Sequence, residues 1–312
     1  MPAARDFLEF RTLYSSPIVT VSNYCCHAHR SGPGEEESAA ANMIVLMRRG
    51  AFSKHFGRKK VTADVNQAVF FAKDSVYRVS HPVDCGDCGT IFTLSPWNLN
   101  DIVRGLDPSI DEHPDRPFHF VTGPCHPKIF WRHRLLLQRL EGSRGDPIEQ
   151  FWVDVSTLQL IGDVLESAFD RQSSPRTVHR ITTDTDHAEK TEVAKELLAA
   201  RTSKRITLDE IAREVGASPF SFARMFRRQT GLPVHRYLTL LRLRASLERL
   251  AESDVDLSTL ALHLGFSSHS HFTDLFRREF GETPSNFRRK ASLKSIREIG
   301  RNLIARRSSR DR

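Results

Sequence analysis

The stretch GFSSHSHFTDLFRREFG, from Gly265 to Gly281, decides the fold of the last third of this chain. Together with the apolar residues just before it, this stretch has the signature of a helix, a glycine turn and a second helix. Phe272 and Phe276 lie four residues apart, on the face that the second helix buries. The opposite face of that helix is therefore expected to be exposed.

The same signature occurs about 50 residues earlier, as GASPFSFARMFRRQTG from Gly216 to Gly231. The second copy has one extra residue in its turn, which is tolerable drift for an internal repeat. Thr207 with Glu210 has the spacing of a capping box, and Ser218 followed by Pro219 predicts a helix start. Good helix formers from 237 to 250 predict a connecting helix. Two such units can read two successive major grooves, so DNA is the first partner to consider.

The positive charge of the chain is concentrated at one end. The whole chain has 46 Lys or Arg and 38 Asp or Glu, a formal net charge of +8. From Lys190 onward there are 25 basic and 14 acidic residues, whereas the 189 residues before it contain 21 and 24. A basic part beside a near-neutral part predicts a nucleic-acid module joined to a domain that does not contact phosphate.

The exposed faces of the two second helices supply the candidates for DNA contact. Arg224 can make the bidentate contact to guanine that is the commonest specific contact to a base. Two arginine pairs at matching positions of the repeat are better placed near phosphates, although either pair alone would be interpreted as solvated surface. The base-reading candidates are Phe220, Ser221, Arg224, His269, Ser270, His271 and Asp274, and the phosphate candidates are Arg227, Arg228, Arg277 and Arg278.

Residues from about Lys190 to Arg289 resemble the DNA-binding domain of the AraC/XylS family of bacterial transcription regulators. The resemblance rests on the repeat, on Tyr237 and Arg242 in the connecting helix, and on the closing motif TPSNFR at 283–288. It implies two helix-turn-helix subdomains joined by a long helix, with promoter DNA and RNA polymerase as partners. Asp274 stands where many members have a basic or amide side chain. A carboxylate there can accept a hydrogen bond from cytosine N4 or stay clear of the DNA.

The front half is predicted to contain strands followed by two helices. Short apolar runs broken by Gly, Pro, Asn and Asp predict strands of a sandwich or barrel. These runs are 18–21, 43–47, 68–72, 76–79 and 90–94. A helix around 130–140 and an apolar stripe from Phe151 to Phe169 predict a helical hairpin. The polar stretch 171–186 then predicts an interdomain linker.

This layout is similar to the usual one of the family, in which a cupin-like barrel senses a signal and the hairpin forms a dimer. We therefore expect an α+β, multidomain chain with an N-terminal cupin-like β-barrel and a C-terminal all-α domain of two helix-turn-helix subdomains. The expected boundaries are 1–170 for sensing and dimerisation, 171–189 for the linker, 190–290 for DNA binding and 291–312 for a basic tail. A homodimer and a small-molecule effector bound among apolar side chains complete this expectation.

Five cysteines in a chain with no export signal and no membrane-spanning run predict reduced thiols in a cytoplasmic protein. Cys85 and Cys88 have the spacing of two thiolates on one turn. The segment Cys26-His27-Ala28-His29 resembles the cupin His-x-His motif. A zinc or other transition-metal site, a thiol redox response and plain structural roles are all open. The candidate metal ligands are Cys25, His27, His29, His81, Cys85 and Cys88.

Two other classes of protein are weaker explanations of this sequence. A cupin oxygenase or a cysteine-based alkyl-transfer repair enzyme needs a metal triad or a nucleophile with its base, and neither can be assembled from the front half. An architectural DNA binder has no use for a separate near-neutral domain. The sequence therefore predicts a non-enzymatic transcription regulator, an activator that responds to a small molecule. The alternative is a metal- or thiol-responsive regulator that uses the Cys/His cluster.

Overall fold

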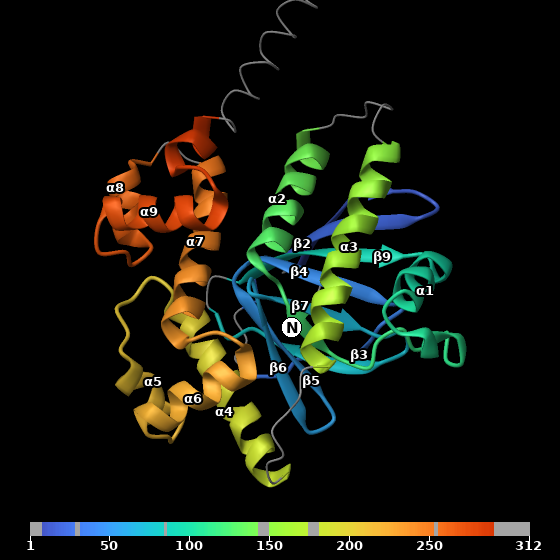
Figure 1. Cartoon of the computed structure of the whole chain (residues 1–312), viewed down its shortest axis with the longest axis horizontal. Coiled ribbons are helices and arrows are strands. Elements are labelled where there is room, and N and C mark those ends of the chain that lie inside the picture. The colour runs from blue at the N-terminus through green and yellow to red at the C-terminus, as the bar shows by residue number, and fades with distance from the viewer. Residues whose placement is uncertain are drawn as a thin grey trace, which may run out of the picture. The chain divides into compact units, whose positions relative to one another are not determined.

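The computed structural model describes residues 8–28, 32–83, 86–142, 150–173, 181–252 and 255–289 (Figure 1). The fold is mixed, with a β-rich N-terminal region and a helical C-terminal region, as the sequence predicts. Contacts group the chain into a first unit, residues 1–201 with 206–241, and a second unit, residues 202–205 with 242–312. None of the helices in the described ranges combines the length and the apolarity needed to cross a membrane.

The strands of the first unit form two antiparallel sheets, with the orders β1-β2-β9-β4-β7-β10 and β3-β8-β5-β6. Consecutive residues of β4 and β7 are buried, so both faces of these strands are covered. The five predicted strands are confirmed as β2, β4, β7, β8 and β9. The bounds are β1 Leu8–Ser15, β2 Val19–Cys26, β3 Glu37–Ser38, β4 Met43–Arg49, β5 Ala51–Phe56, β6 Lys59–Asp64, β7 Gln67–Phe71, β8 Val76–Ser80, β9 Asp87–Leu94 and β10 Thr122–Pro124.

The hairpin of β5 and β6 was not predicted, because its buried side chains are largely polar. Ser53 and Thr62 are fully buried and lie within hydrogen-bond distance of each other. Helix α4 (Ile181–Ala200) supplies their acceptors: the Ser53 hydroxyl donates to Glu196 over 2.5 Å, and the Thr62 backbone N–H donates to Glu192 over 2.6 Å. An apolar-run criterion cannot find strands whose buried face is satisfied by hydrogen bonds from a distant helix.

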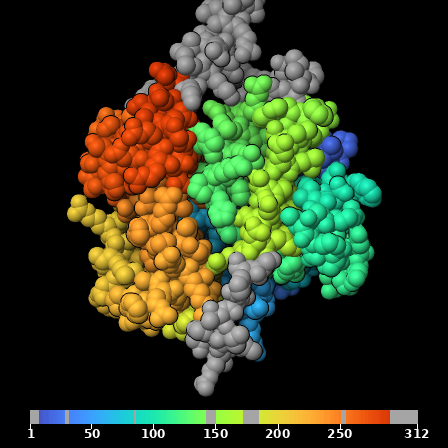
Figure 2. Space-filling model, in the orientation of Figure 1, coloured from blue at the N-terminus to red at the C-terminus, as the bar shows by residue number. Residues whose placement is uncertain are grey.

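The predicted helical hairpin is confirmed as α2 (Pro127–Gly142) packed against α3 (Gln150–Ser173). Figure 2 shows the two helices side by side on the surface of the first unit. Leu136, Leu140 and Leu165 are buried in this unit. Two short helices precede the hairpin, α1 (Pro96–Arg104) and η1 (Pro108–Asp111).

The predicted linker region contains two helix ends. Helix α3 continues to Ser173, and α4 begins at Ile181, inside the stretch expected to be a linker. The contacts also place α4 and the first helix pair with the strands of the first unit. It stays a prediction that the DNA-binding domain begins at residue 190 and can bind DNA without the residues before it. The predicted basic tail lies outside the described residues.

Two similar helix pairs follow, connected through α7 (Val234–Glu252). The first pair is α5 (Leu208–Glu214) and α6 (Pro219–Thr230), and the second is α8 (Leu257–His263) and α9 (His269–Phe280). Ile211 and Leu260 are buried at matching positions of the two first helices. Leu208, at the first turn of α5, is 39% exposed and so does not belong to this core.

Candidate nucleic-acid interface

Local sequence signals determine both ends of α6. The Ser218 side chain accepts a hydrogen bond from the Ser221 backbone N–H over 3.3 Å, and Pro219 occupies the first turn, where no N–H is needed. Gly231 ends the helix at φ +80°, a conformation that favours glycine. Phe222 and Phe226 are fully buried, which leaves the opposite face of α6 exposed.

The exposed face of α6 presents an aromatic ring beside a guanidinium group. Phe220 is 74% exposed, and Ser221 and Arg224 are also exposed. The Arg224 guanidinium carbon lies 5.7 Å from the centre of the Phe220 ring. A cation at this distance interacts with the face of the ring, which limits the orientations of the arginine before any partner binds. The predicted base-reading residues of the first pair are therefore accessible.

Helix α9 repeats this construction with different side chains. Ser268 accepts a hydrogen bond from the His271 backbone N–H over 3.1 Å, and Gly281 ends the helix at φ +77°. The predicted base-reading residues of α9 are all exposed: His269, Ser270, His271 and Asp274.

The outward side chains of α9 also interact with one another. A ring nitrogen of His271 lies 3.0 Å from the Ser267 hydroxyl, and Asp274 lies 3.4 Å from the Arg277 guanidinium. Asp274 thus pairs with a predicted phosphate-binding arginine. This pairing lowers the net charge of the exposed face of α9, whereas α6 has no acidic residue in its sequence.

The predicted phosphate-binding arginines lie in the last turns of α6 and α9. Arg227, Arg277 and Arg278 are exposed, whereas Arg228 is half-buried. Cations in the last turn also stabilise the negative end of a helix dipole, which is the structural alternative to phosphate contact. Their role in binding stays a prediction.

Three side chains of the front region contact α6 or the start of α7, and none of these contacts was found from the sequence. Arg171 of α3 donates from Nη2 to the backbone carbonyls of Arg228 and Gln229, both over 2.7 Å. The Tyr237 hydroxyl donates to Asp64 over 2.5 Å, and the Asn66 side-chain amide donates to the Tyr237 carbonyl. Burial raises the Tyr237 pKa well above its usual value, and the neighbouring Asp64 charge raises it further. No local pattern indicates partners so distant along the chain.

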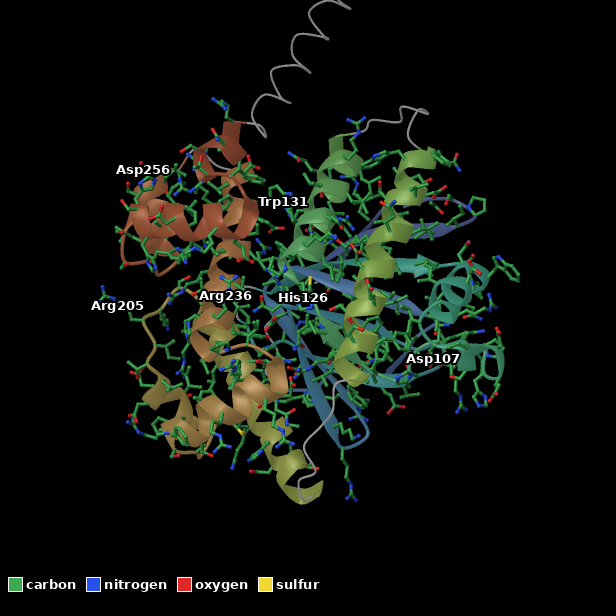
Figure 3. All side chains as sticks on the ribbon, in the orientation of Figure 1. Asp107, His126, Trp131, Arg205, Arg236 and Asp256 are labelled. Atoms are coloured by element: carbon green, nitrogen blue, oxygen red, sulfur yellow. A yellow bond between two sulfur atoms is a disulfide. The ribbon has the colours of Figure 1, made fainter. Side chains whose placement is uncertain are left out.

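A cavity of about 310 Å³ lies within the first unit beside these contacts. Figure 3 labels two of its lining residues, His126 just before α2 and Arg236 on α7. The lining combines backbone and side chains of β10, α3 and the turn between α6 and α7, and includes Asn66, Gln67, Thr122, Cys125, His126, Ser167, Asp170, Arg171, Thr230, Leu232, Arg236 and Tyr237.

In the second unit, Arg242 of α7 ties three backbone segments together. Its guanidinium donates to the carbonyls of Thr202, Lys204 and Gly265 over 2.8 to 2.9 Å. Gly265 forms the turn between α8 and α9 at φ +81°. A Cβ at this position would approach the Arg242 guanidinium to 2.8 Å, so the turn needs a glycine for two separate reasons. Asp256 caps the start of α8 by accepting two backbone N–H groups (Figure 3).

Among the described residues, the predicted metal ligands do not gather into one cluster of three or more. Cys25 and Cys88 form a disulfide, so the expectation of reduced thiols is wrong for this pair, and neither sulfur is available as a ligand while the bond exists. The two residues are paired neighbours on β2 and β9, an arrangement that depends on strand register. His27 lies 3.8 Å from Glu9. His29 and Cys85 lie outside the described residues.

His81 has partners that the sequence analysis did not assign. Its Nε2 lies 3.5 Å from Cys26 Sγ, and its Nδ1 lies 2.6 Å from Asp87 Oδ2. Burial alone would lower the His81 pKa. The hydrogen bonds to Asp87 and Cys26 and the Asp87 charge outweigh this effect and raise the pKa to about 10. The structure therefore brings Cys26, His81 and Asp87 together, a grouping that the sequence did not indicate.

Comparison with known proteins gives one family match, in the last third of the chain, and several similar regulators. Residues 211–290 match a family model described as a helix-turn-helix domain. The HTH-type transcriptional activator RhaS of Escherichia coli O157:H7 is 37% identical over 83 residues, 27% of this chain and 30% of RhaS. The regulatory protein PocR of Salmonella typhimurium is 29% identical over 111 residues, 36% of this chain and 37% of PocR. The chain thus spans about a third of the length of the curated relatives it matches.

Among solved structures, a transcriptional regulator with an AraC-type DNA-binding domain from Chromobacterium violaceum is similar to part of the chain. It is 29% identical, and the match covers 33% of this chain and 92% of that one, with a TM-score of 0.32. ToxT from Vibrio cholerae, solved with a bound unsaturated fatty acid, covers 88% of this chain at 12% identity with a TM-score of 0.36.

Proposed function

Starting from a chain whose residues 211–290 are a helix-turn-helix domain of the AraC type, we propose that this protein is a sequence-specific, DNA-binding transcription regulator. In this proposal α6 and α9 each enter a major groove, and the exposed residues at their starts read base edges. The protein acts on promoter DNA in the cytoplasm, recruits RNA polymerase as an activator, and has no enzymatic activity.

One observation carries the proposal: the chain builds the same capped helix twice and leaves its polar face exposed both times. Serine at the start, two buried phenylalanines and a left-handed glycine at the end recur in α6 and α9. An exposed helix with a preoriented arginine, Arg224 beside Phe220, suits direct readout of guanine.

The cavity of the first unit supports a response to a small molecule. Its lining includes residues of α3 and of the turn that ends α6, next to the hydrogen bonds of Arg171. A ligand bound there would act on the contacts between the front region and helices α6 and α7. A ligand can change DNA affinity only by the difference in its own affinity for the two states, so DNA must change ligand affinity by the same factor. The strand domain serves as the cupin-like sensor in this proposal.

The helical hairpin supports a homodimer. Leu135 of α2 and Phe151 and Trp152 of α3 are exposed, and Phe151 is 81% exposed. Large apolar side chains that are exposed together are typical of surfaces that contact another protein chain. Leu165, by contrast, is fully buried, so a charge there would disrupt the fold rather than a dimer. Phe151→Glu is therefore the variant that tests the dimer. Sedimentation should show a larger fraction of monomer for Phe151→Glu than for the wild type, and equal fractions of monomer would contradict the proposed interface.

The DNA contacts are tested on the full chain with a site selected from random duplexes. Arg224→Ala should weaken binding to the selected site by about 5- to 150-fold, or about 1 to 3 kcal/mol, and relax the preference at one or two base positions. Arg277→Ala should weaken binding to selected and random DNA about equally and make the salt dependence less steep.

Arg213→Ala is the matched control, because Arg213 is an exposed arginine of α5 that pairs with Asp209. It should leave binding nearly unchanged. Equal losses on selected and random DNA for Arg224→Ala would contradict base reading by α6. Absence of salt-sensitive DNA binding by the folded wild type would refute the proposed function itself.

A further inference from the structure

We propose that Cys26, His81 and Asp87 form a binding site for a divalent transition-metal ion of the zinc type. Cys26 Sγ and His81 Nε2 are the ligand atoms in this proposal, and Asp87 orients the imidazole through Nδ1. The three side chains come from β2, from the segment after β8 and from the start of β9. This inference goes beyond DNA binding and does not depend on it.

The separation of the two ligand atoms matches one tetrahedral ion. Zinc lies about 2.3 Å from a cysteine sulfur and about 2.0 to 2.1 Å from a histidine nitrogen, so two such ligands at a tetrahedral angle are about 3.5 Å apart. Cys26 Sγ and His81 Nε2 are 3.5 Å apart. The ligand atoms of all three residues lie within 4.8 Å of one another. Thiolate and imidazole together favour zinc over magnesium or calcium.

Asp87 has the position of the carboxylate that usually supports a metal-bound histidine. Its Oδ2 lies 2.6 Å from His81 Nδ1, so the ring can donate there, and Nε2, which faces Cys26, would bind the ion after losing its proton. Asp87 is 1% exposed, and its second oxygen, Oδ1, has no donor at full hydrogen-bond geometry, although the buried Tyr24 hydroxyl interacts with the carboxylate. A buried carboxylate oxygen without a donor is costly. Water on a bound ion would supply the missing donor.

The backbone around the site is built for close approach. Gly86 has φ +73°, and a Cβ there would lie 2.1 Å from the Cys26 carbonyl oxygen. Gly50 has φ +70°, and a Cβ there would lie 2.2 Å from the Gly86 carbonyl oxygen and 2.9 Å from Asp87 Cα. Two glycines thus allow three segments to meet where the ligands converge. Cys26 and Asp87 are paired across β2 and β9, so sheet register places them on the same face.

Cobalt(II) is the probe for this site, because a cobalt–thiolate bond gives a charge-transfer absorption that reports sulfur ligation. The full chain is stripped of metal under reducing conditions without DNA and titrated with Co²⁺. We expect one equivalent per chain with thiolate absorption, and displacement by Zn²⁺. Cys26→Ser and His81→Ala should abolish the absorption, and Asp87→Asn should weaken binding about 10- to 100-fold.

Cys125→Ser is the matched control, because Cys125 is the other buried free cysteine in the described part of the chain. Cys125→Ser and the double variant Cys25→Ser/Cys88→Ser should bind Co²⁺ like the wild type. Circular dichroism checks that Cys26→Ser and His81→Ala remain folded.

Three results would overturn the site. The first is cobalt binding by Cys26→Ser at wild-type affinity. The second is loss of binding in Cys25→Ser/Cys88→Ser but not in Cys26→Ser, which would assign the ion to the other thiols. The third is a folded wild type that binds neither Co²⁺ nor Zn²⁺. In that case, alkylation of Cys26 by iodoacetamide faster than that of Cys125 would make the cluster a reactive thiol site. None of these results depends on DNA binding, so they can be told apart from a failure of the proposed function.

Discussion

Replacing Gly265 by alanine should destabilise the α8–α9 pair far more than the same change at its repeat counterpart, Gly216. Both glycines form the turn between two helices at positive φ, +81° and +66°. A Cβ on Gly216 meets no atom within 4 Å, whereas a Cβ on Gly265 meets the Arg242 guanidinium at 2.8 to 3.1 Å. Both substitutions therefore place a Cβ on backbone with positive φ, which costs conformational free energy. Only Gly265→Ala also brings that Cβ against the Arg242 guanidinium.

The magnitudes follow from these two contributions. A non-glycine residue in the left-handed region costs about 1 to 2 kcal/mol, which is the whole effect expected for Gly216→Ala. At Gly265 the guanidinium must also move, and it is half-buried with three carbonyl acceptors. Losing one hydrogen bond from a charged donor costs about 1.5 to 3 kcal/mol. We therefore expect about 2.5 to 5 kcal/mol for Gly265→Ala.

Native-state hydrogen exchange measures each helix pair separately in the full chain. The opening free energy of α9 amides should fall in Gly265→Ala, and that of α6 amides should fall less in Gly216→Ala. A double-mutant cycle isolates the contact: in an Arg242→Ala background, Gly265→Ala should cost only the backbone contribution. Equal costs for the two glycine variants, or an unchanged Gly265→Ala cost without Arg242, would refute the reasoning.

Two further predictions concern the front region. Burial lowers the Lys54 pKa to about 8, from the ordinary lysine value of 10.5. Burying the charged amine therefore reduces the free energy of unfolding by its full amount below pH 8, and this reduction disappears as the pH rises to 10.5. Unfolding free energies should therefore rise for the wild type relative to Lys54→Met between pH 8 and 10.5, and a pH-independent difference would contradict this. The Cys25–Cys88 disulfide closes a separation of 63 residues, which corresponds to about 4 kcal/mol of loop entropy. Reductant should lower the urea midpoint of the wild type but not of Cys25→Ser/Cys88→Ser, and non-reducing peptide mapping should recover the linked pair.

Local signals in the sequence were sufficient for the helices that carry the candidate DNA contacts. The capping box of Thr207 and Glu210 is present, and Ser218 with Pro219 starts α6 as predicted. Phe222 and Phe272 are buried at matching positions of the repeat. Caps, periodicity and turn glycines act within a few residues, so each can be read from a short stretch. The charge asymmetry is equally independent of the fold.

The sequence was insufficient wherever function depends on residues far apart along the chain. It listed Cys25 and Cys88 among the candidate metal ligands and expected reduced thiols, whereas strand register joins them as a disulfide. It left Cys26 out of the ligand set and gave no partner to His81, because the pairing of β2 with β9 decides which cysteine lies beside Asp87. A shift of one residue in that register would exchange the two cysteines between the faces of the sheet.

The same limit applies to the contacts between the front region and helices α6 and α7. Arg171 and the carbonyl of Arg228 are 57 residues apart, and Asp64 and Tyr237 are 173 apart. Residue types and spacing determined that this chain would form capped helices with an exposed basic face. Only the tertiary structure decided which distant side chains meet, because such contacts depend on strand register and helix packing, which no short segment specifies.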